Sequence, residues 1–578
     1  MSTDDYVRVA QLAKLESDGR KLVSPRGRSV ALFSHEGEVY AVDNRCPHMG
    51  FPLTEGTVED GILTCHWHHA RFELSCGDTF DIWADDVQTY PTEIRDGEVY
   101  LDPDPEPDVP PETYWRNRLV DGLSENISLV MAKAVINLDD LGEGFTTPLE
   151  TTLDFGINYR AMGWGPGLTT LGTMANLYDW VDHDEKLRAM YVGAREVADN
   201  VAGEPARFDQ YALGNEELTK DRLKAWFREN CEVRDADGAE RVIRTAATIL
   251  PPEAVVEILV AAATDHLYMN TSHTLDFLNK ACETLDHVGW EKAPDVLGAS
   301  VQTLTDASRA EETSSWRQPI DVAALVFDAH EALPDLVVAG EGRTWERPDG
   351  FVETLLADDP EAIVEALRDA IRDGATAQQL TDAVARAATR RVAQFGTSNE
   401  FNDWNTVHHT FSYANAAHEL ARRTDAPDAY LPAFDGAVSV YLDRFLNEPA
   451  APIPDPDSSD RNPADVRGDL LDAFDEHGQV DEAGRLAAEH FAAGGDPGML
   501  IRTLGRGLLR EDPQFHTLQN VEGAIRRYQR ADSDWGKRLP LTATARYVSA
   551  HSPTRRSSEQ TFDIARRLHR GEKLHDAE

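Results

Sequence analysis

The feature that most constrains this chain is a pair of short segments that carry cysteine and histidine at metal-ligand spacing. The first contains Cys46 and His48, and after sixteen residues (49–64) the second contains Cys65 and His68. Each segment offers one thiolate and one imidazole, which are donors that transition metals prefer in proteins. This donor set suits either a tetrahedral zinc ion or an iron–sulfur cluster.

The way the two ligand types are shared between the segments favours the cluster. Zinc fingers usually pair cysteine with cysteine and histidine with histidine, whereas here each segment holds one of each. From about Tyr6 to Leu101 the chain resembles the Rieske [2Fe–2S] family. The resemblance implies that a [2Fe–2S] cluster is bound and that this end of the chain transfers single electrons, with zinc as the alternative. The ligands that it implies are Cys46, His48, Cys65 and His68.

Departures from the family pattern place this segment in one branch of it. The respiratory-complex branch adds a bridging cysteine to each loop, but Phe51 and Trp67 stand at those places here. The segment therefore resembles the ferredoxin and ring-hydroxylating oxygenase branch. His66 and His69 stand where relatives usually have proline and glycine. We interpret both as polar loop residues; the alternative is that they form part of an outer shell that tunes the cluster. Cys76 is interpreted as a structural residue.

Strand-like alternation in residues 1–101 changes to helical periodicity further along the chain. Between these regions, residues 102–113 are rich in proline and acid and predict an extended linker. We expect an α-helical domain over 114–447, an acidic, proline-rich loop over 448–465 and a helical continuation over 466–578. The fold class expected is therefore a small β domain followed by a large, mostly α-helical domain with a degenerate repeat.

The repeat is a His-Thr pair that occurs three times, with an alanine eight residues after each histidine. The three histidines are His273, His409 and His516. We expect each near the start of a helix and take them as candidate catalytic residues or metal ligands, since neutral histidine suits both roles. Alternatively, the threonines cap helices and the histidines only pack against the next repeat.

A second set of polar residues accompanies the repeat. His266 lies seven residues before His273 and is expected on the same helix face, and His408 and Glu419 are expected to share a face of another helix. These three form a further candidate site for a second metal or for an organic cofactor of unknown type. The signature of di-iron bundles, Glu-x-x-His on two helices, is absent, because no glutamate lies three residues before any of these candidate histidines.

The net charge of −46 excludes a nucleic-acid partner, because the chain has no basic stripe to meet phosphates. Arginine outnumbers lysine more than fourfold, and acidic residues are spread along the whole chain. We expect a salt-rich, halophile-like cytoplasm as the setting. The chain has five cysteines, and assigning two to the cluster leaves three. An odd, scattered remainder argues against a disulfide framework and suits a reducing compartment. No apolar run is long enough to cross a membrane, and no signal peptide is expected.

These features together predict an oxidoreductase that receives electrons from a reductase or ferredoxin. Its first domain would deliver them singly to a site in the helical domain, where a small molecule is the expected substrate. The chain lacks the Asp-x-x-His-x-x-x-x-His segment of ring-hydroxylating oxygenase large subunits, so we do not expect a standard member of that class. The alternative is a ferredoxin-like carrier or redox sensor fused to a non-catalytic helical scaffold.

Overall fold

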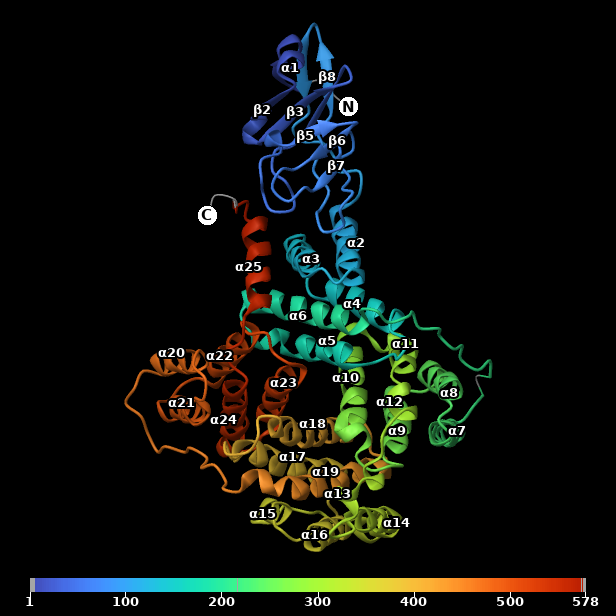
Figure 1. Cartoon of the computed structure of the whole chain (residues 1–578). Helices are drawn as coiled ribbons and strands as arrows, with labels where there is room; N and C mark the ends of the chain where they lie inside the picture. The colour runs from blue at the N-terminus through green and yellow to red at the C-terminus, as the bar shows by residue number, and fades with distance from the viewer. Residues whose placement is uncertain (1–5, 216, 573, 575–578) are drawn as a thin grey trace. The chain divides into compact units, whose positions relative to one another are not determined.

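The computed structural model describes residues 6–215, 217–572 and 574 (Figure 1). They form two compact units. The first contains the described residues up to Thr152 together with those from Gln560 onward, and the second spans Leu153–Glu559.

The β part of the first unit consists of three antiparallel sheets of three strands, with the orders β1-β9-β8, β2-β3-β4 and β5-β6-β7. Buried aliphatic and aromatic side chains such as Leu32, Leu63 and Phe72 form its core. The alternation of buried and exposed residues along β4 and β9 explains why these strands can be recognised in the sequence. The elements are β1 Val7–Gln11, α1 Leu12–Asp18, β2 Arg20–Val23, β3 Val30–His35, β4 Glu38–Asp43, β5 Thr57–Glu59, β6 Ile62–Thr64, β7 Arg71–Glu73, β8 Thr92–Arg95 and β9 Glu98–Leu101.

The first unit also contains α2 (Pro111–Ser124) and α3 (Ser128–Asp140). Buried ion pairs fix them, because Arg118 of α2 and Lys133 of α3 both contact Asp85 of the β part, at 3.1 and 2.9 Å. Residues 102–113 therefore separate β structure from helix, but the first compact unit continues beyond them. The last residues of this segment already belong to α2.

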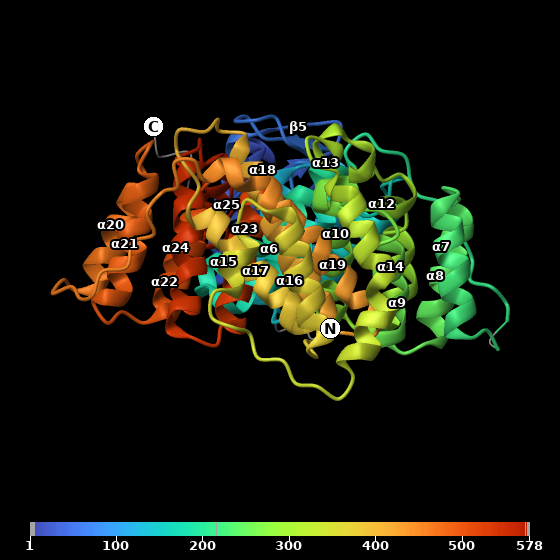
Figure 2. The same cartoon turned by 90° about the horizontal axis from the view of Figure 1, so that it is seen from below.

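The second unit is helical, and Figures 1 and 2 show the pair α7–α8 and the pair α20–α21 at its opposite edges. Its helices are α5 Pro166–Leu177, α6 His183–Val201, α7 Lys220–Glu232, α8 Ala236–Ile249, α9 Pro252–Ala263, α10 His273–Val288, α11 Ala293–Ala299, α12 Gln302–Thr305, α13 Ser314–Arg317, α14 Val322–Gly340, α15 Phe351–Leu355, α16 Pro360–Arg372, α17 Ala377–Ala393, α18 Asp403–Ala421, α19 Leu431–Leu442, α20 Pro463–Ala473, α21 Val480–Ala492, α22 Pro497–Leu509, α23 Phe515–Arg530 and α24 Asp534–Ala550. Two further helices, α4 Thr146–Asn158 and α25 Ser557–His569, contain residues of both units.

The predicted fold class, a small β domain followed by a large helical region, is confirmed. Within the helical unit, α18 packs against both α10 and α23, and α5 also contacts both. The alanine that follows each His-Thr pair is buried in these contacts, as Ala281, Ala417 and Ala524 show. A small side chain at this place lets neighbouring helices approach closely. None of the described helices is both long and apolar enough to span a bilayer.

Candidate metal centres

The two ligand loops of the β domain share one backbone design. Cys46 donates its N–H to the carbonyl of Phe51 at 2.8 Å, and Gly50 donates back to the Cys46 carbonyl at 2.8 Å. In the second loop His69 donates to the Cys65 carbonyl at 3.0 Å. Gly50 and His69 occupy equivalent places, four residues after the cysteine, and both have a positive φ, of 85° and 64°. A histidine pays a steric cost there that glycine does not.

The loops place like ligands beside one another. Cys46 and Cys65 are buried and their thiols share a hydrogen bond, which raises the pKa of Cys46 and lowers that of Cys65 to about 6. The rings of His48 and His68 lie on the more exposed side, with centroids 4.9 Å apart and planes at 82°. Two thiolates on the inner side and two imidazoles on the outer side fit a [2Fe–2S] cluster with one iron held by each pair.

The neighbouring polar residues lie outside this ligand set. His66 and His69 are exposed, and the His66 ring contacts the Thr57 hydroxyl at 3.4 Å. Cys76 is an exposed thiol whose backbone N–H donates to Glu73 at 2.7 Å. Their surroundings are those of ordinary polar loop residues.

Comparison with known proteins agrees with this geometry. Residues 5–91 match the model of the Rieske [2Fe-2S] domain. The 3-phenylpropionate/cinnamic acid dioxygenase ferredoxin subunit of Photorhabdus laumondii is 39% identical over 74 residues, which are 12% of this chain and 70% of that protein. The ferredoxin component of the naphthalene 1,2-dioxygenase/salicylate 5-hydroxylase systems of Ralstonia sp. is 30% identical over 100 residues, 17% of this chain and 96% of that protein.

This chain belongs to the Rieske [2Fe–2S] family. Among solved structures, the Sphingomonas yanoikuyae B1 ferredoxin matches 17% of this chain and 98% of its own at 28% identity, with a TM-score of 0.16. The Rieske domain binds a [2Fe–2S] cluster and has an electron-transfer role, so zinc is not its metal.

A buried charge cluster supports the first ligand loop, and it was not anticipated from the sequence. Lys133 donates to the carbonyls of Pro47 and His48 at 2.6 and 3.2 Å and to Asp85 at 2.9 Å. Arg118 holds the other oxygen of Asp85 at 3.1 Å. Lys133 is far from the cluster motif in sequence, and a single lysine in an apolar helix gives no signal of its partner.

In the helical unit the structure brings His273, His409 and His516 together. His273 is the first residue of α10 and His516 the second of α23, whereas His409 is the seventh residue of α18. The expected position near a helix start is therefore correct for two and wrong for the third. His409 reaches the other two because α18 packs against both of their helices.

The three rings are close enough to share one ion. Nε2 of His409 lies 3.0 Å from Nε2 of His516, and one ligand nitrogen of each ring lies within 4.8 Å of the others. Two nitrogens at Zn–N distances can be at most about 4.2 Å apart, so the widest of these separations must shorten for the three rings to share one ion. Burial and the neighbouring rings lower the pKa values of His273, His409 and His516 to about 4, 3 and 4. All three are thus neutral at pH 7, which is the form that binds metals.

Unpaired buried atoms beside the rings also fit a bound ion or an ordered water. Nδ1 of His273 and Nε2 of His408 have no hydrogen-bond partner in the described part of the chain. Buried polar atoms are nearly always paired in native proteins, so such orphans need an explanation. Helix capping does not provide one, because the residues before α10 and α23 make no side-chain cap bond and Thr274 donates to the Thr303 carbonyl instead.

The other candidate residues lie in separate environments, apart from His408. His266 is not on the α10 face, because it follows α9 in a turn and bonds Glu232 and Glu311 at 2.6 and 2.7 Å. Glu419 is on α18 but ten residues beyond His409, about 15 Å along the axis, where it pairs with Arg530. His408 is buried beside the three histidines, with its ring centroid 5.2 Å from that of His516.

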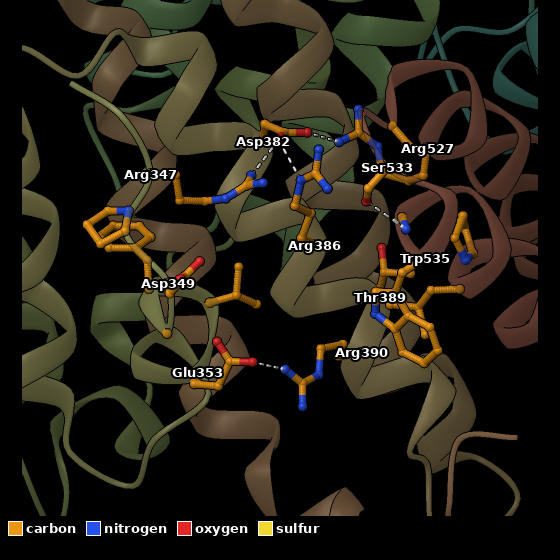
Figure 3. Close-up of a pocket in the computed structure, with 18 residues that line it drawn as sticks. Arg347, Asp349, Glu353, Asp382, Arg386, Thr389, Arg390, Arg527, Ser533 and Trp535 are labelled. Atoms are coloured by element: carbon orange, nitrogen blue, oxygen red, sulfur yellow. Dashed lines mark hydrogen bonds and ion pairs between the residues drawn. The ribbon is translucent and has the colours of Figure 1, made fainter. Parts of the chain in front are cut away.

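A cavity of about 420 Å³ elsewhere in the helical unit is ringed by arginines (Figure 3). Asp382 lies at one side of the cavity and contacts Arg347, Arg386 and Arg527 at 3.2, 2.7 and 3.2 Å. Glu353 pairs with Arg390 at 2.7 Å. Each guanidinium already has a carboxylate partner, so we interpret these residues as an ion-pair network that ties α17 to α23.

Proposed function

We propose that this protein is an oxidoreductase in which the Rieske domain passes single electrons to a metal ion held by His273, His409 and His516. The observation that carries the proposal is the convergence of three neutral imidazoles in the same chain as a one-electron domain. Three protein ligands leave coordination positions open, as in catalytic metal sites. Imidazoles suit iron, copper, nickel and zinc, and the first two can accept or give up an electron.

The electron donor in this proposal is a separate reductase or ferredoxin. The matched relatives are named as ferredoxin components of dioxygenase systems, and components of such systems are carriers between partners. The substrate is a small molecule that reaches the three-histidine site. A cytoplasmic, salt-rich location agrees with the acidic composition and the unpaired cysteines.

The experiment that tests the proposal is metal analysis with EPR on full-length protein purified without oxygen in high salt. We expect two irons for the cluster and one further metal per chain. The double variant His273→Ala/His516→Ala should lose the further metal and keep the Rieske signal, whereas Cys46→Ser should lose the signal and keep the further metal.

Electron delivery requires a second measurement on the iron-loaded protein. Reduction by a protein donor should remove the high-spin ferric signal of the helical site in the parent but not in Cys46→Ser. Two irons and no further metal per chain in the parent, with a metal content unchanged by the histidine variant, would contradict the proposal. The carrier-on-a-scaffold alternative would then hold.

A further inference from the structure

A cavity of about 310 Å³ opens onto the three-histidine site from the side of His409. One wall is aromatic, since the rings of Tyr268 and Trp316 lie with their planes at 29° and their centroids 5.8 Å apart. The hydroxyl-bearing residues Thr410 and Ser439 also line the cavity, next to the phenol of Tyr268. The cavity therefore combines a flat apolar face with hydrogen-bonding groups beside a candidate metal.

Asp443, the first residue of the short helix Asp443–Asn447, lines the cavity and carries a buried carboxyl oxygen without a partner among the residues that the structure describes. It is 7% exposed, and its Oδ2 has no hydrogen-bond partner among the residues that the structure describes. Burial raises the pKa of this carboxyl to about 7. A buried carboxyl with a free oxygen costs about 1–3 kcal/mol unless something binds to it.

The hydroxyls connect Asp443 to the aromatic wall. Thr410 also bonds the Asp443 carboxyl, its hydroxyl lies 2.6 Å from that of Ser439, and the phenol of Tyr268 lies 3.4 Å from the same Thr410 oxygen. Thr410 directly follows His409, so the hydroxyl network and the ligand nitrogen come from one turn of α18. A molecule in the cavity can contact both.

The segment between this cavity and His273 is held in a costly conformation. Tyr268, Asn270, Thr271 and Ser272 all have positive φ, from 44° to 90°, although none is glycine. Such backbone persists only where surrounding bonds impose it, and it is concentrated at functional sites. Asn270 supplies these bonds, because its side chain contacts Thr274, the Thr303 carbonyl and Ser308 within 2.9–3.4 Å.

We propose that this cavity is the ligand pocket of the three-histidine site and that it binds an uncharged single-ring compound with a hydroxyl or carbonyl oxygen. The ring packs against Tyr268 and Trp316, and its oxygen bonds to Asp443. The inference rests on the proposed function, whose substrate class it names. Arg309, which lines the cavity, contacts Glu232 at 3.2 Å through a terminal nitrogen, while its Nε has no hydrogen-bond partner among the described residues. We take the ligand to be uncharged because a chain of charge −46 repels anions and a buried carboxyl, Asp443, lines the same cavity.

The first test is calorimetric titration of the full-length protein in high salt with 4-hydroxyacetophenone. A matched pair of variants accompanies it: one places a bulky side chain at the cavity, and the other places the same side chain on the adjacent surface. Ser315 and Ser314 are adjacent and exposed, but only Ser315 is among the residues that line the cavity. We expect Ser315→Trp to weaken binding at least about tenfold and Ser314→Trp to leave it within about twofold.

The second test addresses Asp443. Asp443→Leu removes the hydrogen bond at similar volume and should weaken binding about tenfold, whereas Asp443→Asn keeps a polar group and should stay within about threefold. No binding by the parent, equal effects of the two tryptophan variants, or tighter binding of 4-hydroxybenzoate would overturn the proposal. The titration needs no electron donor, so failure of electron delivery would not alter its result, and a failed titration would not alter the metal and EPR results.

Discussion

At the scale of single residues, Lys133 is a buried cation bonded to the backbone of the cluster loop. A positive charge there favours the reduced, more negative cluster. Charges about 8 Å apart at an effective dielectric constant of about 20 interact by about 2 kcal/mol, and Asp85 offsets part of this. We therefore expect Lys133→Met to lower the reduction potential by roughly 20–60 mV, as measured by EPR-monitored redox titration.

The control for this prediction is Lys14→Met. Lys14 lies in the same unit on α1, is exposed and pairs with Asp18 at 3.5 Å. Its removal should leave the potential unchanged, because exposed charges are screened by solvent and salt. Equal potentials in the parent and in Lys133→Met, with the Rieske spectrum intact, would show that Lys133 only braces the loop.

Asp443 gives a pH-dependent prediction with a definite sign. Its pKa is about 7 in the folded chain and near 3.8 when unfolded, so the folded state holds the proton more tightly. The stability that this group contributes is complete below about pH 4 and is lost as pH rises through 7. Between pH 5 and 8 the parent should lose about 2 kcal/mol more stability than Asp443→Asn, measured by urea unfolding. Parallel pH profiles for the two proteins would contradict this account.

At the scale of elements, periodicity predicted the helices well where one face is apolar. The residues 185–201 and 360–372 show apolar spacing near 3.6 in the sequence and lie in α6 and α16, and the buried residues of α16 follow one stripe. The short strands β5 to β7 were not predicted, since three residues are too few to show alternation. The second cluster loop, residues 65–70, joins β6 to β7.

The residues of the candidate sites also differ in how far the sequence could predict them. The four candidate cluster ligands lie close together in sequence and could be named from their spacing. The three histidines could be named from the repeat, but their convergence depends on how α10, α18 and α23 pack. Asp443 and Lys133 could not be found from the sequence, because a lone acid or lysine in a helical pattern says nothing about the cavity or loop that it meets.

A buried ion-pair cluster links α10 to α23. Lys280 contacts Glu283 and Glu522 at 2.7 and 2.6 Å, and all three side chains are at most 3% exposed. Lys280→Met leaves two buried carboxylates with fewer partners and should destabilise the helical unit by about 3 kcal/mol. Because the same helices carry His273 and His516, metal affinity should also fall. Thermal unfolding and metal titration measure the two effects.

Lys292→Met is the matched substitution for that prediction. Lys292 pairs with Asp154 at 3.1 Å, but both side chains are partly exposed. Surface pairs contribute at most about 1 kcal/mol, so this variant should unfold close to the parent temperature. If the two lysine variants unfolded alike, the buried pair would not be what holds α10 to α23.

At the scale of the whole molecule, 102 acidic against 56 basic side chains dominate the energetics at low salt. Many basic groups are already used in ion pairs such as those around Asp382, so most of the excess carboxylates repel one another. Their repulsion is felt over about 10 Å at 0.1 M salt and about 3 Å at 1 M. The unfolding temperature should therefore rise by at least about 5 °C between 0.1 and 1 M KCl.

Scanning calorimetry measures this unfolding temperature, with an equal osmolality of sucrose as the control for solvent exclusion. A temperature that is flat in KCl, or that sucrose raises equally, would mean that charge repulsion does not limit this fold, and the salt-rich setting would lose its physical basis.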